Sequence, residues 1–112
     1  MRKTALTIAC LLSLAFAGAA EAQTLGQNDI MGTWCGNETI YIILPSQLTV
    51  VWRADGDSAK FPITGFDYLP DAKIRMNWID SKQANVQTVF GELAPDRSRM
   101  LQYINNRPFR RC

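Results

Sequence analysis

From residue 33 onward, short runs of β-branched and aromatic residues alternate with turn-forming residues. In the clearest run, residues 73–78, Ile74, Met76 and Trp78 occupy alternate positions, and the positions between them are polar. A period of two residues is typical of a half-buried strand, because successive side chains of a strand point to opposite faces. This run therefore predicts a strand with one face against a core.

Turn signals separate the other runs. Residues 55–58 (Asp-Gly-Asp-Ser) and 94–97 (Ala-Pro-Asp-Arg) are expected to form tight turns, and residues 67–71 are expected to form a loop. Pro62 predicts an edge position or an irregularity in its strand, since proline has no N–H to donate to a ladder. Strands are expected at residues 33–35, 39–44, 47–53, 60–66, 73–78, 85–93, 98–104 and 107–111.

These strands predict an all-β fold, a small antiparallel up-and-down β-barrel of seven or eight short strands that forms a single domain over residues 31–112. Short connections favour pairing between strands that follow one another in sequence. An open sheet of this kind leaves exposed edges, whereas a barrel removes them. No stretch after residue 22 has the periodicity of an amphipathic helix.

Residues 1–22 have the pattern of a helical signal peptide. Basic residues at positions 2 and 3 precede an apolar run at residues 5–17, and small residues follow at the positions that signal peptidase reads. Cleavage is expected after Ala22, with Ala19 as the alternative, and lipid attachment at Cys10 is a further alternative. The run is shorter than the roughly 20 residues that span a bilayer. The mature protein of a bacterium is therefore expected in the periplasm or outside the cell.

Residues 23–30 are expected to form a flexible N-terminal arm. Apart from Leu25, residues 23–28 are polar or glycine, and they show no periodicity. A segment with so few apolar side chains buries too little surface to fix its conformation.

Two cysteines follow the leader, Cys35 in the first expected strand and Cys112 after the last. In an oxidising compartment two thiols persist as a disulfide, and two cysteines allow one intramolecular pairing. The sequence thus predicts a disulfide between Cys35 and Cys112. Pairing of Cys112 with another molecule is the alternative.

Charge and residue content argue against several classes of function. The chain has 12 basic and 10 acidic side chains, a formal net charge of +2. So small a charge gives no field for nucleic acid, and peripheral membrane contact is not expected either. The chain has no histidine, which removes the Ser-His-Asp and Cys-His systems and the commonest zinc ligand. We therefore expect a protein that is not an enzyme and uses no cofactor or metal.

Two chemical alternatives stay open beside that expectation. Glu38 and Glu92 could form a carboxylate pair like that of a glycosidase, although nothing in the sequence brings them together. The acidic turn at residues 55–58 could suggest calcium, but it lacks the spacing and the distal glutamate of an EF-hand loop. Aspartates in turns usually bond their own backbone, so a hairpin turn is the preferred interpretation.

Gly32-Thr33-Trp34 on the first strand of an all-β meander, with arginines near the last strand, resembles the calycin barrels. This group includes lipocalins, avidins and a family of bacterial metalloprotease inhibitors. The resemblance implies that Trp34 closes one end of the barrel and that Arg107 or Arg110 packs across its ring. Stacking of a guanidinium on an indole is favourable. Unlike lipocalins, the chain is short and shows no second lipocalin motif.

Among calycins, the metalloprotease inhibitors are nearest in size. They are exported, carry one disulfide and have a flexible N-terminal arm that enters the protease cleft. The resemblance therefore implies inhibition of an extracellular hydrolase as one function, with residues 23–28 as the inhibitory arm. The Thr-Trp-Cys-Gly opening and the Pro-Phe-Arg-Arg-Cys ending are also similar to those of small exported proteins of unassigned function from Gram-negative bacteria.

The C-terminal end is the main candidate surface for a partner. Arg107, Arg110 and Arg111 surround Phe109 there, an arrangement that suits an acidic partner or an anionic surface. A solvated end with one arginine packed on Trp34 is the alternative. Exposed aromatic and apolar loop residues are also enriched at binding sites. The candidate partner-binding residues are Leu25 in the arm, Tyr68 and Leu69 in the loop, and Phe109 and Arg111 at the C-terminal end.

Together these features predict a monomeric, non-enzymatic binding module for a protein or cell-surface partner. Inhibition of an extracellular hydrolase is the first alternative. Transport of a small ligand is the second, and it requires a pocket lined by Trp34, Trp52 and Trp78. Their positions on the apolar faces of strands favour a filled core instead, since a barrel of eight strands is just wide enough for side chains to fill.

Overall fold

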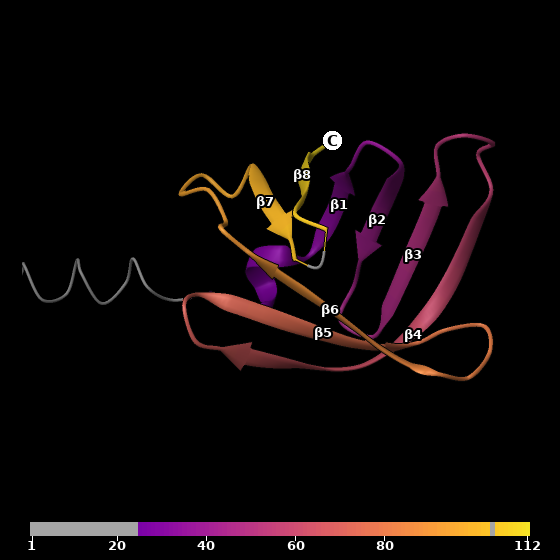
Figure 1. Ribbon diagram of the computed structural model, residues 1–112, viewed down its shortest axis with the longest axis horizontal. Helices are drawn as coiled ribbons and strands as arrows, with labels where there is room; N and C mark the ends of the chain where they lie inside the picture. The colour runs from indigo at the N-terminus through magenta and orange to yellow at the C-terminus, as the bar shows by residue number, and fades with distance from the viewer. Residues whose placement is uncertain (1–24, 104) are drawn as a thin grey trace, which may run out of the picture.

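The structure is a computed structural model that describes residues 25–103 and 105–112, and the leader predicted at residues 1–22 lies outside them. The chain forms a closed antiparallel barrel in which consecutive strands pair and the last strand pairs with the first (Figure 1). The predicted all-β barrel is confirmed. Its strands are β1 (Gly32–Cys35), β2 (Thr39–Ile43), β3 (Gln47–Trp52), β4 (Ser58–Leu69), β5 (Lys73–Ile79), β6 (Asn85–Gly91), β7 (Arg99–Gln102) and β8 (Arg107–Arg111).

Tight turns connect the strands where the sequence predicts them. In the turn between β3 and β4, Gly56 has a φ of 77°, a conformation that glycine adopts readily. The N–H of Asp57 donates to the Asp55 carboxylate at 3.0 Å. Between β5 and β6, the Asp80 carboxylate accepts from the N–H of Lys82 at 2.9 Å. Such local bonds are what aspartate supplies in turns, and they favour the hairpin interpretation of residues 55–58.

The longest strand, β4, connects two parts of the barrel wall. Residues 58–62 pair with β3, residues 63–69 pair with β5, and a bulge lies between Ile63 and Gly65. Figure 1 shows β4 sweeping from the side of β3 to lie along β5. The predicted loop at residues 67–71 is wrong for residues 67–69, because their pairing with β5 extends the strand to Leu69.

The core fills the inside of the barrel. Buried residues alternate with more exposed ones most clearly along β3 and β5, as the period of two requires. The rings of Tyr41 and Phe109 stack with centroids 4.9 Å apart. The side chains with the least exposure in this core are Trp34, Phe90, Ile30, Ile43, Leu48, Ile74 and Met76.

The three tryptophans have different surroundings. Trp34 is fully buried, whereas Trp78 is half-buried and packs on Phe61 with ring centroids 5.0 Å apart. The Nε1 of Trp78 donates to the Thr88 hydroxyl at 3.0 Å. Trp52 is 40% exposed, so the prediction that it belongs to the core is wrong. It is the last residue of β3 and lies two positions beyond the buried Val50.

Residues 25–30 lie against the barrel and include a short 3-10 helix, η1 (Gln27–Ile30). The Asp29 carboxylate accepts from the N–H of Gly26 at 2.8 Å and fixes the start of η1. Ile30 is fully buried and Leu25 is 8% exposed. The prediction of a flexible arm is therefore wrong for residues 25–30, since both apolar side chains enter the core. Residues 23 and 24 lie outside the described part.

Candidate functional site

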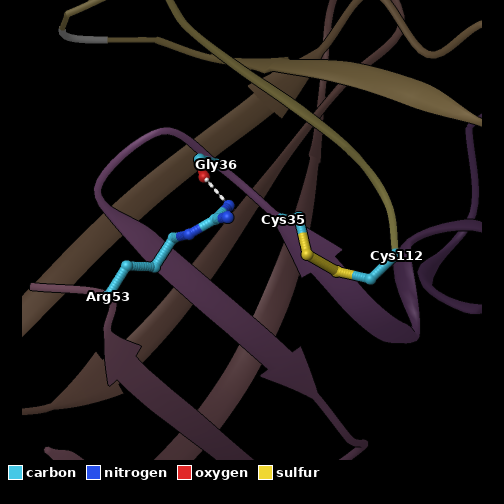
Figure 2. The surroundings of a disulfide bond; sticks show 4 residues. All are labelled: Cys35, Gly36, Arg53 and Cys112. Carbon is cyan, nitrogen blue, oxygen red and sulfur yellow. Dashed lines mark hydrogen bonds between the residues drawn. A yellow bond between two sulfur atoms is a disulfide. The ribbon is translucent and has the colours of Figure 1, made fainter. Parts of the chain in front are cut away.

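A disulfide joins Cys35, at the end of β1, to Cys112, just beyond β8, as the sequence predicts. The two Cα atoms are 5.4 Å apart, within the range of native disulfides. Beside the bridge, Nη1 of Arg53 donates to the Gly36 carbonyl at 2.8 Å (Figure 2). The two contacts hold the β1–β2 turn, the end of β3 and the C-terminal strand to one another.

Trp34, Arg111 and η1 pack together at a place that we call the closed end, after the role that the calycin resemblance implies for Trp34. The guanidinium carbon of Arg111 lies 3.9 Å from the centroid of the Trp34 ring, within the range of a cation–π contact. The Nε1 of Trp34 donates to the Ile30 carbonyl at 2.9 Å, which ties the closed end to η1. An arginine does stack on Trp34, but the expectation that it would be Arg107 or Arg110 is wrong.

The alternation of side chains along β8 explains this difference. Phe109 and Arg111 are two residues apart and share the inner face, whereas Arg110 between them is exposed. Arg107 lies at the opposite end of β8 and pairs with Glu38, at a nitrogen–oxygen distance of 3.9 Å. Burial of Phe109 thus places Arg111, rather than Arg110, at the closed end.

The guanidinium of Arg111 donates hydrogen bonds to three backbone carbonyls of the fold. Its Nη2 donates to the Asp29 carbonyl at 2.8 Å, its Nε donates to the Arg97 carbonyl at 3.0 Å, and its Nη1 donates to the Met31 carbonyl. Burial lowers the pKa of Arg111 from its ordinary value. Gly32 has a φ of 111°, and a Cβ there would lie 2.8 Å from Nη1 of Arg111. Glycine is therefore required beside this arginine.

The carboxylate of Asp29 supports the closed end from η1. It accepts from Nε of Arg97 at 2.9 Å as well as from Gly26. The bond from the Gly26 N–H is the main cause that lowers the pKa of Asp29, and Arg97 and Arg111 lower it further, against a smaller opposing effect of burial. Asp29 is thus held in its charged form.

A groove of about 500 Å³ lies over β7 and β8, between the β1–β2 turn and the β6–β7 loop. Its volume is within the range of small-molecule binding sites. Leu101 and Pro108 are directly opposite one another on β7 and β8, and Ala94 and Pro95 supply apolar surface from the loop. The disulfide borders the groove through Cys35.

Three arginines line the groove: Arg53, Arg99 and Arg110. Arg99 and Arg110 are cross-strand partners and both are exposed. Residues in such positions have Cβ atoms about 4.5–5.5 Å apart, and like charges there destabilise the sheet. The groove therefore holds two positive charges whose repulsion destabilises the sheet.

The other arginines of the described part are engaged elsewhere. Arg75, Arg97 and Arg107 form ion pairs with Asp67, Asp29 and Glu38, and Arg111 stacks on Trp34. Within residues 25–103 and 105–112, none of the three groove arginines forms an ion pair with a carboxylate. The groove is thus lined by the three arginines of the described barrel that neither form an ion pair nor stack on Trp34.

Two carboxylates lie near these arginines. Glu92 lines the groove and accepts a hydrogen bond from the Tyr103 hydroxyl at 3.2 Å. Hydrogen bonds from Ser98 are the main cause that lowers the pKa of Asp96, and the charge of Arg99 contributes. Three guanidinium groups against one lining carboxylate leave the groove with an excess of positive charge.

The residues predicted to bind a partner do not form one surface. Leu25 and Phe109 are 8% and 2% exposed, so neither is an exposed surface residue, although Phe109 lines the groove. Arg111 belongs to the closed end. Tyr68 is 64% exposed, as expected, and Leu69 is half-buried, but both lie in β4 rather than in a loop.

Sequence reasoning missed Arg53, Arg99 and the apolar pair of Leu101 and Pro108. The signal that could have found Arg99 is the hairpin of the last two strands, because its register sets Arg99 opposite Arg110. Arg53 follows β3, and it lines a groove over β7 and β8 because β8 pairs with β1 and closes the barrel. No local sequence pattern indicates that Arg53 lies there.

The structure also bears on the chemical alternatives. Glu38 pairs with Arg107, whereas Glu92 bonds with Tyr103. The described residues contain no group of three or more His, Cys, Asp or Glu that could hold a metal ion. Of the lining residues of the groove, none is a tryptophan, so this groove is not the pocket that the carrier alternative requires.

In the part of the chain that the structure describes, no helix has both the length and the apolar character to cross a bilayer.

A scan against protein-family models and searches of curated proteins and of solved structures found no match to this chain. The calycin resemblance therefore stays a prediction, and the function has to be proposed from the site itself.

Proposed function

We propose that this protein is an exported, non-enzymatic binding module that engages a macromolecular partner through the groove over β7 and β8. One observation above all supports this. Arg99 and Arg110 occupy directly opposite, exposed positions, and neither forms an ion pair with a carboxylate among the described residues. Two opposed guanidinium groups weaken a sheet, and an anionic group on a partner turns that repulsion into attraction.

The composition of the groove supports the same function. Arginines lie beside the apolar pair of Leu101 and Pro108, and protein interfaces combine arginine with an apolar centre in this way. The Cys35–Cys112 bridge and the hydrogen bond from Arg53 to Gly36 brace one wall. A braced wall lowers the cost of ordering the site when a partner binds.

Export is part of the proposal. The leader pattern at residues 1–22 and the disulfide both suit an oxidising compartment, in which such a bridge persists. An arginine stacked on the tryptophan of the first strand also supports a calycin-like barrel. Because residues 25–30 pack on the barrel, no observation favours a hydrolase inhibitor over a more general binding module.

Partner capture tests the proposal. The mature protein is immobilised and exposed to periplasmic and culture extracts, beside an Arg99→Glu/Arg110→Glu variant and a Lys60→Glu/Lys82→Glu control. The control makes the same change in charge at exposed lysines outside the groove. We expect at least one protein to be retained by the wild type and the control but lost by the groove variant. Equal retention by all three would contradict the proposal.

A further inference from the structure

The strand register arranges the groove side chains in two rows. Arg99 on β7, Arg110 on β8 and Cys35 on β1 are successive cross-strand partners and form one row on the outer face. Leu101 and Pro108 form the neighbouring row, two residues along each strand. At about 3.3 Å per residue, the two rows are roughly 6.6 Å apart. A cationic row and an apolar row therefore lie side by side.

We infer that this groove binds an extended peptide segment of a partner protein, with a carboxylate between Arg99 and Arg110 and an apolar side chain against Leu101 and Pro108. In an extended peptide, residues i and i+2 also point to one side and lie about 6.6 Å apart. A carboxylate and an apolar residue at that spacing match the two rows. This inference rests on the proposed function and adds the chemistry of the ligand.

The guanidinium groups favour a carboxylate as the anion. A guanidinium is a planar fork of N–H donors that binds a carboxylate through two parallel hydrogen bonds. Arg99 and Arg110 present two such forks from neighbouring strands. Arg53 lines the same groove and donates to the Gly36 carbonyl through Nη1, so its guanidinium is held in place at the groove wall.

A long polyanion suits the groove less well. Glu92 lines it and Asp96 is close enough to Arg99 for their charges to interact, so a continuous line of negative charge would meet repulsion. The chain as a whole carries a formal net charge of only +2, too little to attract nucleic acid or a sulfated polysaccharide over a distance. Separate carboxylates on a peptide can avoid both acids.

An anionic membrane also suits the groove less well. Membrane-binding surfaces combine clustered lysines or arginines with apolar side chains that project into the headgroup region. Here the apolar side chains, Leu101 and Pro108, lie in a concave site between the β1–β2 turn and the β6–β7 loop. A narrow segment of chain can enter such a site, whereas a bilayer surface cannot.

Binding of a designed peptide tests the inference. The probe is a fluorescein-labelled peptide, Ser-Glu-Ser-Leu-Ser-Glu-Ser, which presents glutamate and leucine on one side when extended. One matched peptide replaces both glutamates by glutamine. A second, Ser-Ser-Glu-Leu-Glu-Ser-Ser, has the same composition but places leucine on the opposite side. Each is titrated with the mature protein at low salt, and binding is followed by fluorescence anisotropy.

We expect the first peptide to bind the wild type and the Lys60→Glu/Lys82→Glu control with equal affinity. Arg99→Glu/Arg110→Glu should weaken binding by about 10- to 100-fold, because charged hydrogen bonds are lost. The glutamine peptide and the rearranged peptide should bind the wild type more weakly. The milder Arg110→Gln variant, which should weaken binding by roughly tenfold, replaces the double variant if that variant does not fold.

Several results would overturn the inference. They are no binding of the first peptide, equal binding of the glutamine peptide, and equal binding by the folded groove variant. Binding of heparin or of phosphatidylglycerol vesicles without peptide binding would assign the groove to a polyanion or a membrane. A dimer that the groove substitutions dissociate, measured by sedimentation, would assign it to a second copy of this chain.

Failure of this inference can be told apart from failure of the proposed function. If the peptide does not bind but Arg99→Glu/Arg110→Glu still loses a captured partner, the groove is a binding site and only the ligand chemistry is wrong. If the variant keeps every captured partner, the groove itself is the wrong site.

Discussion

Arg110 and Arg111 are neighbours on β8, yet they lie in two regions of the barrel with different contacts and exposure. At the closed end, Arg111 stacks on Trp34 and donates to three backbone carbonyls. On the outer face, Arg110 is exposed and lies opposite Arg99. One strand thus contributes to stability through its inner face, and we propose that it contributes to binding through its outer face. Substitutions at adjacent positions should therefore have unrelated effects.

The largest effect on stability should come from the disulfide, since it fixes the strand that carries both arginines to β1. Replacing Cys35 and Cys112 by serine opens a loop with a sequence separation of 77 residues. By the chain-entropy relation this should cost about 4 to 5 kcal/mol of unfolding free energy. Urea unfolding of wild type and variant would measure the loss. An unchanged midpoint would show that the bridge does not constrain the chain.

The next effect should separate the two arginines directly. Arg111→Ala removes the stacking on Trp34 and leaves three carbonyls without their donor, and it should cost roughly 2 to 4 kcal/mol. Arg110→Ala should change the free energy of unfolding by no more than about 0.5 kcal/mol, as for most exposed positions. Thermal and urea unfolding of the two variants would measure the contrast. Equal losses would remove the distinction between the two faces of β8.

A glycine between the two regions gives a third test. Gly36 is buried, and a Cβ there would lie 2.6 Å from Cε1 of Phe109. Gly36→Ala should therefore destabilise the barrel by about 1 to 3 kcal/mol through overpacking. Gly65→Ala is the matched control, because a Cβ at that position meets no atom within 4 Å. Unfolding free energies that fall equally for both glycines would contradict the close contact with Phe109.

A smaller loss than that of Gly36→Ala is predicted for Asp29 at the closed end. Hydrogen bonding lowers the pKa of Asp29 below 3.8 in the folded protein. Its stabilising effect, about 0.5 to 1 kcal/mol for a partly exposed group, is therefore complete above the unfolded pKa and disappears as the pH falls through the folded one. Asp29→Asn should be less stable than wild type at pH 6, with little difference at pH 2. A gap that does not change with pH would exclude this role.

Much of the fold could be predicted from the sequence, because its determinants are local. Alternation marked the strand at residues 73–78, turn aspartates marked the hairpins, and two cysteines allowed one bridge. The burial of Leu25 and Ile30 could not be predicted, since two apolar residues in a polar segment show no period. It depends on the core of the barrel, which only tertiary structure supplies.

The site was harder to predict because it depends on register and closure. Alternation on β8 relates Arg111 to the buried Phe109, but only if Phe109 is known to face inward. The meeting of Arg99 with Arg110 depends on the register of the last hairpin, and a shift of one residue would place Arg99 on the other face. The charge excess of the groove is thus a property of strand pairing and has no signature in the composition.

The central claim is that Arg99 and Arg110 serve binding and not stability. The most direct test is the urea midpoint of Arg99→Ala/Arg110→Ala and of the wild type at low salt, with and without the Ser-Glu-Ser-Leu-Ser-Glu-Ser peptide. Without peptide, we predict a midpoint equal to or above that of the wild type, because repulsion between the two guanidinium groups is removed. With peptide, the wild-type midpoint should rise, as it does for any ligand that binds the folded state, and the variant midpoint should not. A variant that unfolds at clearly lower urea without peptide, or that peptide stabilises as much as the wild type, would contradict the assignment of these arginines to binding.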